Sequence, residues 1–275
     1  MQWLYKLAKK PFFGNYMVSW RNPLSETQRL EWKLIRFQSN SRALLSGLVA
    51  ESKSTVTKGV IVLGHPMGKE AKGYFLKNGY TDLLRENGYH VLIFDLNGFG
   101  ESQTGNFDYF EDIISAGYEA KRRYPEYPLG YFGISMGGQF ATIAFAEGHP
   151  FEFAIVESAA NTLEDFWIHY PFAHKALKLL YLLMPRYQKR IRMIDRIKKA
   201  NGLRKLLLIY IENDAVILDD AGKKFKEACP LPTELVIFKN AKHAELAKSI
   251  HRDSYFKVIL DHFNANSNLV VQCRN

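Results

Sequence analysis

The chain has 275 residues, 47% hydrophobic and 24% charged, which is typical of a globular protein that buries a substantial core. Its 37 basic residues exceed its 28 acidic ones, and the net charge of +9 favours anionic partners: phospholipid head groups, an acidic carrier protein or a phosphorylated ligand. The only cysteines, Cys229 and Cys273, lie far apart, which argues against a disulfide framework and a metal site, and no aromatic-interleaved basic motif indicates nucleic acid.

The amino-terminal stretch "MQWLYKLAKKPFFGNYMVSW" does not have the pattern of a signal peptide, because lysines interrupt its apolar residues. No later run approaches the roughly 18 apolar residues needed to cross a bilayer. Trp3, Leu4 and Leu7 share one side of a predicted short helix, which permits peripheral membrane contact; the alternative is a helix packed on the domain. We treat residues 1–28 as an extension. We expect a cytoplasmic protein, with peripheral contact at the inner face of a membrane as an option.

Apolar runs and helical patterns alternate along the rest of the chain. "EWKLIRFQSNSRALLSGLVAES" predicts two strands around "QSNS", with five residues available to the core: Leu34, Phe37, Leu44, Leu45 and Leu48. Further strands are predicted at "GVIVLG", "HVLIFDL", "LGYFGI", "FEFAIVES", "LRKLLLIYI" and "TELVIF", and helices near 72–88, 108–124 and 137–147. Continuous apolar strands separated by helices indicate a single α/β domain. We expect a doubly wound, mostly parallel sheet of about eight strands with helices on both faces.

One connection is too long for a simple crossover. Residues 159–202 hold two helical patterns, "HKALKLLYLLM" and "YQKRIRMIDRIKK", separated by Pro185, and we interpret this segment as a helical cap over the carboxyl edge of the sheet. Its aromatic residues either line an acyl pocket or pack against the domain. We place the following residues in the substrate pocket: His65, Phe166, Trp167 and Tyr170.

The stretch "RYQKRIRMIDRIKK" is strongly basic, with seven basic residues and one acid, Asp195. It is either a solvated helix face or a docking surface for an anionic membrane or a phosphate-bearing substrate. In the docking interpretation Arg190, Arg192 and Arg196 contact the anionic partner.

A glycine-rich junction between a strand and a helix presents a serine. Residues 133–137, "GISMG", have the pattern G-x-S-x-G, in which a serine sits on a sharp, strained turn at the carboxyl end of a parallel strand. Side chains at the flanking glycines would collide with the neighbouring strand and helix, and the amides of the following helix point toward developing negative charge. The alternative is a helix-capping serine. The strand-turn-helix setting favours Ser135 as a nucleophile.

A serine nucleophile needs a base, and the base needs an orienting acid. Of the eight histidines, only His243 combines a position after the last strand with the expected order after Ser135. Asp214, in the loop after "LRKLLLIYI", is the predicted acid, and Glu157, at the end of "FEFAIVES", is the rival. Two amides should hold an oxyanion. Met136 follows the serine directly, and in "HPMG" the natural donor is Met67, because Pro66 has no N–H group.

These motifs together resemble the α/β-hydrolase superfamily over about residues 30–265. The resemblance rests on "GHPMG", "DLNGFGES", "GISMGG", "ENDAVI" and "NAKHAEL", in that order. "DLNGFGES" is similar to the D-x-R-G-x-G-x-S segment of cap-bearing members, with Asn97 where arginine is common, and His65-Pro66 replaces the commoner His-Gly. The resemblance implies a cofactor-free acyl-transfer mechanism and a cap that forms much of the substrate pocket.

Three functions remain open at this point. The first is hydrolysis of a small or medium carboxylic ester, including a lipid-derived acyl ester, by a Ser-His-Asp triad. The second is a thioesterase whose basic cap meets an acidic acyl carrier or coenzyme A. The third is a non-catalytic binding or membrane-associated protein that keeps the fold. The triad does not encode the bond cleaved, so peptidase and carbon–carbon hydrolase activities stay open as well.

Overall fold

The computed structural model describes residues 2–274, with side chains through Ser267. Eight strands are present in the described chain: β1 (Lys33–Ser39), β2 (Ala43–Ala50), β3 (Gly59–Gly64), β4 (Tyr89–Phe94), β5 (Leu129–Ile134), β6 (Phe153–Glu157), β7 (Lys205–Ile211) and β8 (Thr233–Phe238). The α-helices are α1 (Gln2–Phe13), α2 (Glu26–Arg29), α3 (Gly73–Lys77), α4 (Tyr80–Glu86), α5 (Tyr109–Arg123), α6 (Met136–Ala144), α7 (Leu163–Trp167), α8 (Pro171–Leu183), α9 (Pro185–Arg190), α10 (Met193–Ile197), α11 (Ala221–Ala228) and α12 (Arg252–Arg274), and a short 3₁₀ helix spans Leu246–Lys248.

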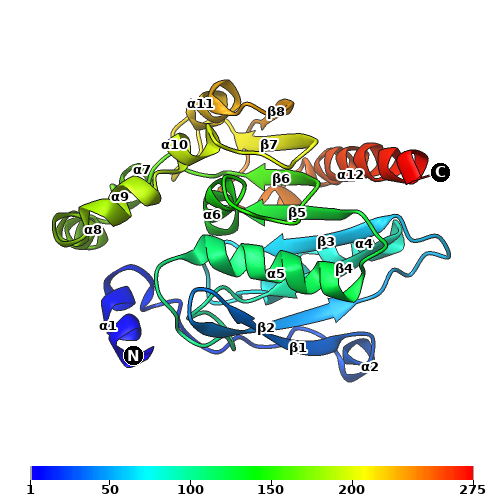
Figure 1. Cartoon of the computed structure of the whole chain (residues 1–275), viewed down its shortest axis with the longest axis horizontal. Helices are drawn as coiled ribbons and strands as arrows, with labels where there is room; N and C mark the ends of the chain where they lie inside the picture. Colours follow the sequence, from blue (N-terminus) through cyan, green and yellow to red (C-terminus); the bar gives the residue numbers. More distant parts are fainter. Residues whose placement is uncertain (1, 275) are drawn as a thin grey trace.

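The strands form one sheet in the order β1-β2-β4-β3-β5-β6-β7-β8 (Figure 1). β2 is antiparallel to both neighbours, β1 and β4, and every other pair is parallel. The predicted mostly parallel, doubly wound sheet of eight strands is therefore confirmed. Its parallel part brings the carboxyl ends of β3 to β8 to one edge, where functional loops meet.

Both faces of the central strands are buried, because successive side chains point to opposite faces. Val60 and Val62 of β3 pack in the cluster that includes α5, α6, α10 and α11. Ile61 and Leu63 pack in the cluster that includes α3, α4 and α12. This explains why the central strands are continuous apolar runs rather than alternating ones.

The first predicted strand holds one error. Leu34 was expected in the core, but its side chain is 55% exposed, whereas Ile35 and Phe37 are buried. β1 is an edge strand with one covered face, so its residues alternate between core and solvent. Leu34 and Phe37 are an odd number of positions apart and cannot both face inward.

Two predicted helical stretches are divided in the structure. The helix expected near residues 72–88 consists of α3 and α4, separated where Gly79 adopts a left-handed φ of 82°. The basic stretch of the cap is divided into α9 and α10, with extended backbone at Arg192. Pro185 begins α9, in agreement with its predicted role as a break.

The inserted segment between β6 and β7 lies partly beyond the sheet. α7, α8 and α9 project at the left in Figure 1. α10 instead packs on α6 and α11 with Met193 and Ile197 buried. The last part of the expected cap thus packs on two helices of the domain.

The amino-terminal helix packs on the domain while also exposing apolar residues. Phe12 and Phe13 are buried, and their rings lie 5.5 and 5.7 Å from Trp167. Trp3 and Leu7 remain 67% and 61% exposed. No helix in the described chain has the length and apolarity required to cross a membrane.

A buried lysine also anchors α1. Lys9 is fully buried and donates to Asn97, whose side-chain amide donates in turn to Asp112. Burial lowers the pKa of Lys9 to about 7, although the carboxylates of Asp112 and Asp108 oppose this shift. The expectation that the cysteines form no disulfide is not tested, because the side chain of Cys273 lies outside the described residues.

Candidate active site

Ser135 lies on the tight turn between β5 and α6. Its backbone has φ 49° and ψ −112°, a left-handed φ that non-glycine residues rarely adopt. A Cβ atom on Gly137 would lie 2.0 Å from the carbonyl oxygen of Gly64, and one on Gly133 would lie 2.6 Å from the carbonyl carbon of Gly137. Both glycines are therefore required by close backbone contacts, as the sequence predicts.

Backbone hydrogen bonds hold this turn against neighbouring strands. The Ser135 amide donates to the carbonyl oxygen of Glu157 at 2.8 Å, and the Gly137 amide donates to that of His65 at 3.1 Å. The turn is thus fixed from β6 on one side and from the loop after β3 on the other. This arrangement holds Ser135 in its strained conformation.

Three polar side chains remote in sequence meet at the carboxyl edge of the sheet. His243 Nε2 lies 2.8 Å from Ser135 Oγ, and His243 Nδ1 lies 2.8 Å from Asp214 Oδ2. Asp214 is held by the amides of Val216 and Ile217, which donate to its other oxygen at 2.8 and 3.2 Å. The side chains of Asp214 and His243 are 2% and 18% exposed, so the acid is enclosed and the base borders solvent.

Left-handed backbone recurs beside the base and the acid. Asn213 precedes Asp214 with φ 59°, and Ala244 follows His243 with φ 55°. Such residues cost free energy and cluster at sites where side-chain direction matters. The loops after β7 and β8 are thus bent sharply where they aim a functional side chain.

Glu157, the rival acid, points away from this relay. Its Oε2 accepts a hydrogen bond from Tyr255 on α12, and its Oε1 is buried without a hydrogen-bond partner. Burial raises the pKa of Glu157 to about 8, the Tyr255 hydrogen bond opposes the shift, and the charge of Asp214 adds to it. The carboxylate hydrogen-bonded to His243 is that of Asp214, whereas that of Glu157 is bonded to Tyr255.

A cavity of about 290 Å³ opens at Ser135 and His243. Two residues that the sequence analysis placed in the pocket, Phe166 and Tyr170, line it, and so does Met67. Four charged residues also line it: Lys69, Glu70, Glu245 and Lys248. The cavity therefore combines an aromatic wall from the inserted segment with charged groups of both signs.

Two residues predicted for the pocket do not line this cavity. His65 is fully buried: its Nε2 accepts from the Leu96 amide at 3.0 Å, and its Nδ1 lies 2.8 Å from the Pro66 carbonyl oxygen. Burial lowers the pKa of His65, which favours the neutral ring. Trp167 packs against Phe12 and Phe13 instead, because α1 covers this side of α7. Sequence position alone placed both residues near the site without revealing their direction.

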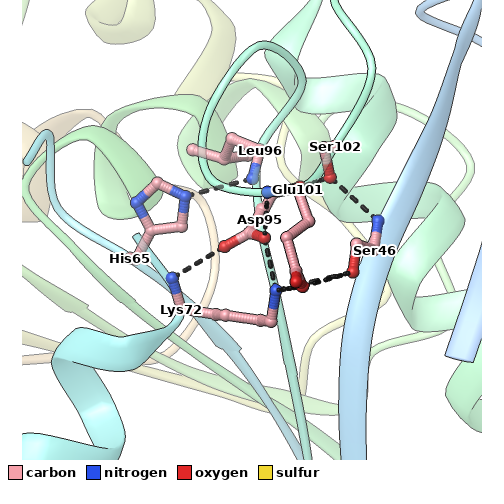
Figure 2. Close-up of polar contacts among 7 residues, drawn as sticks. All are labelled: Ser46, His65, Lys72, Asp95, Leu96, Glu101 and Ser102. Carbon is pink, nitrogen blue, oxygen red and sulfur yellow. Dashed lines mark hydrogen bonds and ion pairs between the residues drawn. The ribbon is translucent and has the colours of Figure 1, made fainter. Parts of the chain in front are cut away.

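The loop that carries Met67 is anchored at both ends. His65 holds one end through Leu96, and at the other the Lys72 amide and ammonium donate to Asp95 at 2.9 and 2.5 Å (Figure 2). The Lys72 ammonium also donates to Glu101 at 2.8 Å, and the side chains of Lys72 and Asp95 are completely buried. Residues 65–72 thus form a short span between fixed points.

The two predicted oxyanion donors belong to different elements. Met136 is the first residue of α6, whose first amides have no partner within the helix. Met67 belongs to the anchored loop and lines the cavity beside Ser135. Among the described residues no group of three or more His, Cys, Asp or Glu side chains is placed to hold a metal ion.

Several residues of the site had no signal in the sequence. Tyr16, just after α1, lines the cavity together with Val216 and Ala244. Lys72 and Asp95 are both fully buried. The sequence predicts only that Lys72 lies at the start of a helix and Asp95 near the end of a strand. Lysine and aspartate are rarely buried unless they are paired, so their burial can be predicted only when the partner residue is known.

Comparison with known proteins supports the same fold. The model of the family described as "Serine aminopeptidase, S33" matches residues 55–205. The Pyrococcus furiosus esterase Pf2001 superposes with a TM-score of 0.71 at 17% identity, covering 90% of this chain and 97% of that one. The acylaminoacyl peptidase of Pyrococcus horikoshii gives 0.62 at 17% identity, over 86% of this chain and 42% of the peptidase. A search of curated protein sequences found no match.

Proposed function

The chain belongs to the S33 serine aminopeptidase family of the α/β-hydrolases, and from this premise we propose that it hydrolyses a carboxylic ester through Ser135, His243 and Asp214. The observation that carries the proposal is the hydrogen-bonded relay, in which His243 lies 2.8 Å from both partners. Nucleophile, base and orienting acid must stand in this relation for a serine hydroxyl to react near neutral pH.

In the proposed reaction the Ser135 hydroxyl attacks the ester carbonyl while its proton passes to His243 Nε2. Asp214 accepts the hydrogen bond from Nδ1 and stabilises the imidazolium. The amides of Met136 and Met67 donate to the tetrahedral oxyanion. His243 returns the proton to the leaving alcohol. A water molecule, deprotonated by the same ring, then attacks the acyl-enzyme and releases the acid.

The cavity favours an ester of modest size. Its aromatic wall, Phe166 and Tyr170, suits an apolar acyl group, and about 290 Å³ is at the lower end of small-molecule pockets. We propose a small or medium acyl ester, including one derived from a lipid. An acyl thioester needs the same relay, and direct comparison of turnover separates the two.

A second candidate is cleavage of an amide next to a free amine. The family description names an aminopeptidase, and the carboxylate-bearing Glu245 lines the cavity beside His243. A carboxylate there suits the ammonium group of such a substrate. Comparing turnover of acyl esters, acyl thioesters and aminoacyl anilides ranks these candidates.

The test of the relay uses two variants and a covalent probe. Ser135→Ala should lose labelling by a fluorophosphonate and turnover of short p-nitrophenyl esters while its circular dichroism stays unchanged. Asp214→Asn should lower kcat by a factor on the order of 10³–10⁴, because the amide favours the wrong imidazole tautomer. Wild-type rates in Ser135→Ala would refute the proposal, and an unlabelled wild type would favour a non-catalytic protein.

A further inference from the structure

Large exposed apolar side chains gather at one end of the molecule. On α1 these are Trp3, Leu4 and Leu7, and on α8 and its flanks they are Ile168, Phe172, Leu179, Leu182, Leu183 and Met184, all at least half exposed. α1 and α8 contact each other and lie at the left end in Figure 1. We call these nine residues, with the exposed lysines of the two helices, the α1–α8 face.

Positive charge is concentrated in the same two segments. Residues 1–25 and 166–194 contain ten of the 37 basic residues and none of the 28 acidic ones, so the rest of the chain is nearly neutral. Lys6 and Lys10 of α1 and Lys175 and Lys178 of α8 are exposed. Of these ten, Lys9 is buried and Arg190 and Arg192 are paired with carboxylates, so the positive charge on the two helices beside the exposed apolar residues comes from these four lysines.

The basic stretch singled out in the sequence is less available than its composition indicates. Arg190 pairs with Asp108 at 3.1 Å, Arg192 with Asp195 at 3.4 Å, and Arg196 with Glu147. Arg190 and Arg196 thereby connect the inserted segment to the domain, whereas the Arg192 pair lies within the segment. The structure therefore moves the expected contact with anionic lipid from this stretch to the α1–α8 face.

We propose that the α1–α8 face docks on an anionic membrane surface. An amphipathic helix lies in a bilayer interface when apolar side chains enter the head-group region and lysines meet anionic lipids. A second copy of the chain is a poorer occupant, because two such faces would bring like charges together. The inference concerns location and does not depend on the reaction at Ser135.

The proposed orientation places the cavity near the lipid. Tyr16, which follows α1, and Tyr170, which precedes α8, both line the cavity that contains Ser135. Docking of the two helices would bring this opening close to the bilayer interface. An acyl ester could then pass from the membrane to the site over a short path.

Flotation with vesicles tests the charge requirement. The full-length Ser135→Ala protein should bind phosphatidylcholine vesicles that contain phosphatidylglycerol and should not bind phosphatidylcholine alone. Lys175→Gln with Lys178→Gln should weaken binding by about fivefold per lysine, the equivalent of about 1 kcal/mol each. The matched control, Lys223→Gln with Lys226→Gln, removes two exposed lysines from α11 and should leave binding unchanged.

A second pair of double variants tests whether vesicle binding needs the exposed apolar side chains of the face. Leu179→Ser with Leu183→Ser should weaken vesicle binding by about tenfold or more, because two side chains no longer enter the interface. Leu30→Ser with Ile250→Ser removes side chains that are each 87% exposed outside the face and should have no effect. All four double variants, made in the active chain, should keep wild-type turnover of a soluble short ester.

Several results would overturn the proposal. These are absence of binding to anionic vesicles, equal binding to neutral vesicles, or equal losses in face and control variants. Concentration-dependent dimerisation that the face variants abolish, without vesicle binding, would assign the face to a second copy. Vesicle binding by a protein without esterase activity would support the docking surface while refuting the proposed reaction.

Discussion

Gly137 shows how a single missing side chain positions the nucleophile. Its Cα approaches the strand that ends at Gly64, and a Cβ there would meet the carbonyl oxygen and carbon of Gly64 at 2.0 and 2.4 Å. Both atoms belong to the backbone of the central strand β3, so neither moves cheaply. The nucleophile turn and the sheet are packed too closely for any other residue type.

We therefore expect Gly137→Ala to lower the free energy of unfolding by about 3 kcal/mol or more and to abolish esterase activity. Urea unfolding followed by fluorescence measures the first effect. Gly148→Ala is the matched control, because a Cβ at Gly148 has no neighbour within 4 Å. Equal stability of the two variants would contradict the packing argument.

Glu157 makes stability depend on pH. Its pKa is about 8 in the folded chain, compared with an ordinary value of 4.5, so between these pH values the unfolded chain has released a proton that the folded chain retains. The free energy of unfolding contributed by this group therefore falls as pH rises from about 4.5 to about 8, by up to about 1.4 kcal/mol per pH unit. Below 4.5 both states are protonated and the penalty disappears.

Glu157→Gln should remove this dependence. Relative to the wild type, the variant should gain stability steadily between pH 5 and pH 8, as measured by urea unfolding at several pH values. Taking the difference between the two proteins cancels the pH dependence that comes from Lys9, which begins near its pKa of about 7 and so overlaps the upper part of this range. Esterase activity should persist in Glu157→Gln, since Glu157 lies outside the relay. A parallel pH profile for both proteins would show that Glu157 is charged when folded.

At the scale of elements, the loop between β3 and α3 depends on a buried ion pair. Lys72 and Asp95 join this loop to the one after β4, and Glu101 adds a second carboxylate (Figure 2). A buried pair contributes little compared with apolar residues, but removing one partner strands the other charge. The pair therefore acts mainly on the position of the loop that carries Met67.

Lys72→Met should lower the free energy of unfolding by about 3–5 kcal/mol, because Asp95 would remain buried without its cation. In protein that still folds, the variant should show a lower kcat and a smaller change in KM. The reason is that the loop positions the Met67 amide, which is proposed to stabilise the transition state. Lys77→Met, at the end of α3 and in an exposed pair with Glu70, should leave the free energy of unfolding almost unchanged. Similar losses in both variants would rule out a special role for the buried pair.

At the scale of the molecule, the amino-terminal helix is part of the fold. Phe13 packs against the rings of Phe99, Tyr109 and Trp167 at 5.6, 5.5 and 5.7 Å, which joins α1 to the domain and to the inserted segment. We expect Phe13→Ala to lower the free energy of unfolding by about 3–5 kcal/mol. Trp3→Ala, at a 67% exposed position of the same helix, should have almost no effect on stability. Thermal unfolding distinguishes the two, and equal melting temperatures would show that α1 is not integral.

The sequence by itself determined the sheet and the order of the functional loops. Continuous apolar runs define buried parallel strands, and the carboxyl ends of such strands meet at one edge. The sequence therefore predicts that Ser135, Asp214 and His243 lie together. The sequence also predicts that Gly133 and Gly137 are required by close backbone contacts, and the structure has these contacts.

Only the tertiary structure decided which way side chains point and what covers them. His65 and Trp167 lie near the site in sequence terms, yet one is buried under the loop after β4 and the other under α1. Partners such as Lys72 with Asp95, or Lys9 with Asn97, are 23 and 88 residues apart. Local patterns carry the period of a strand or helix, whereas the pairing of distant side chains depends on how complete elements pack.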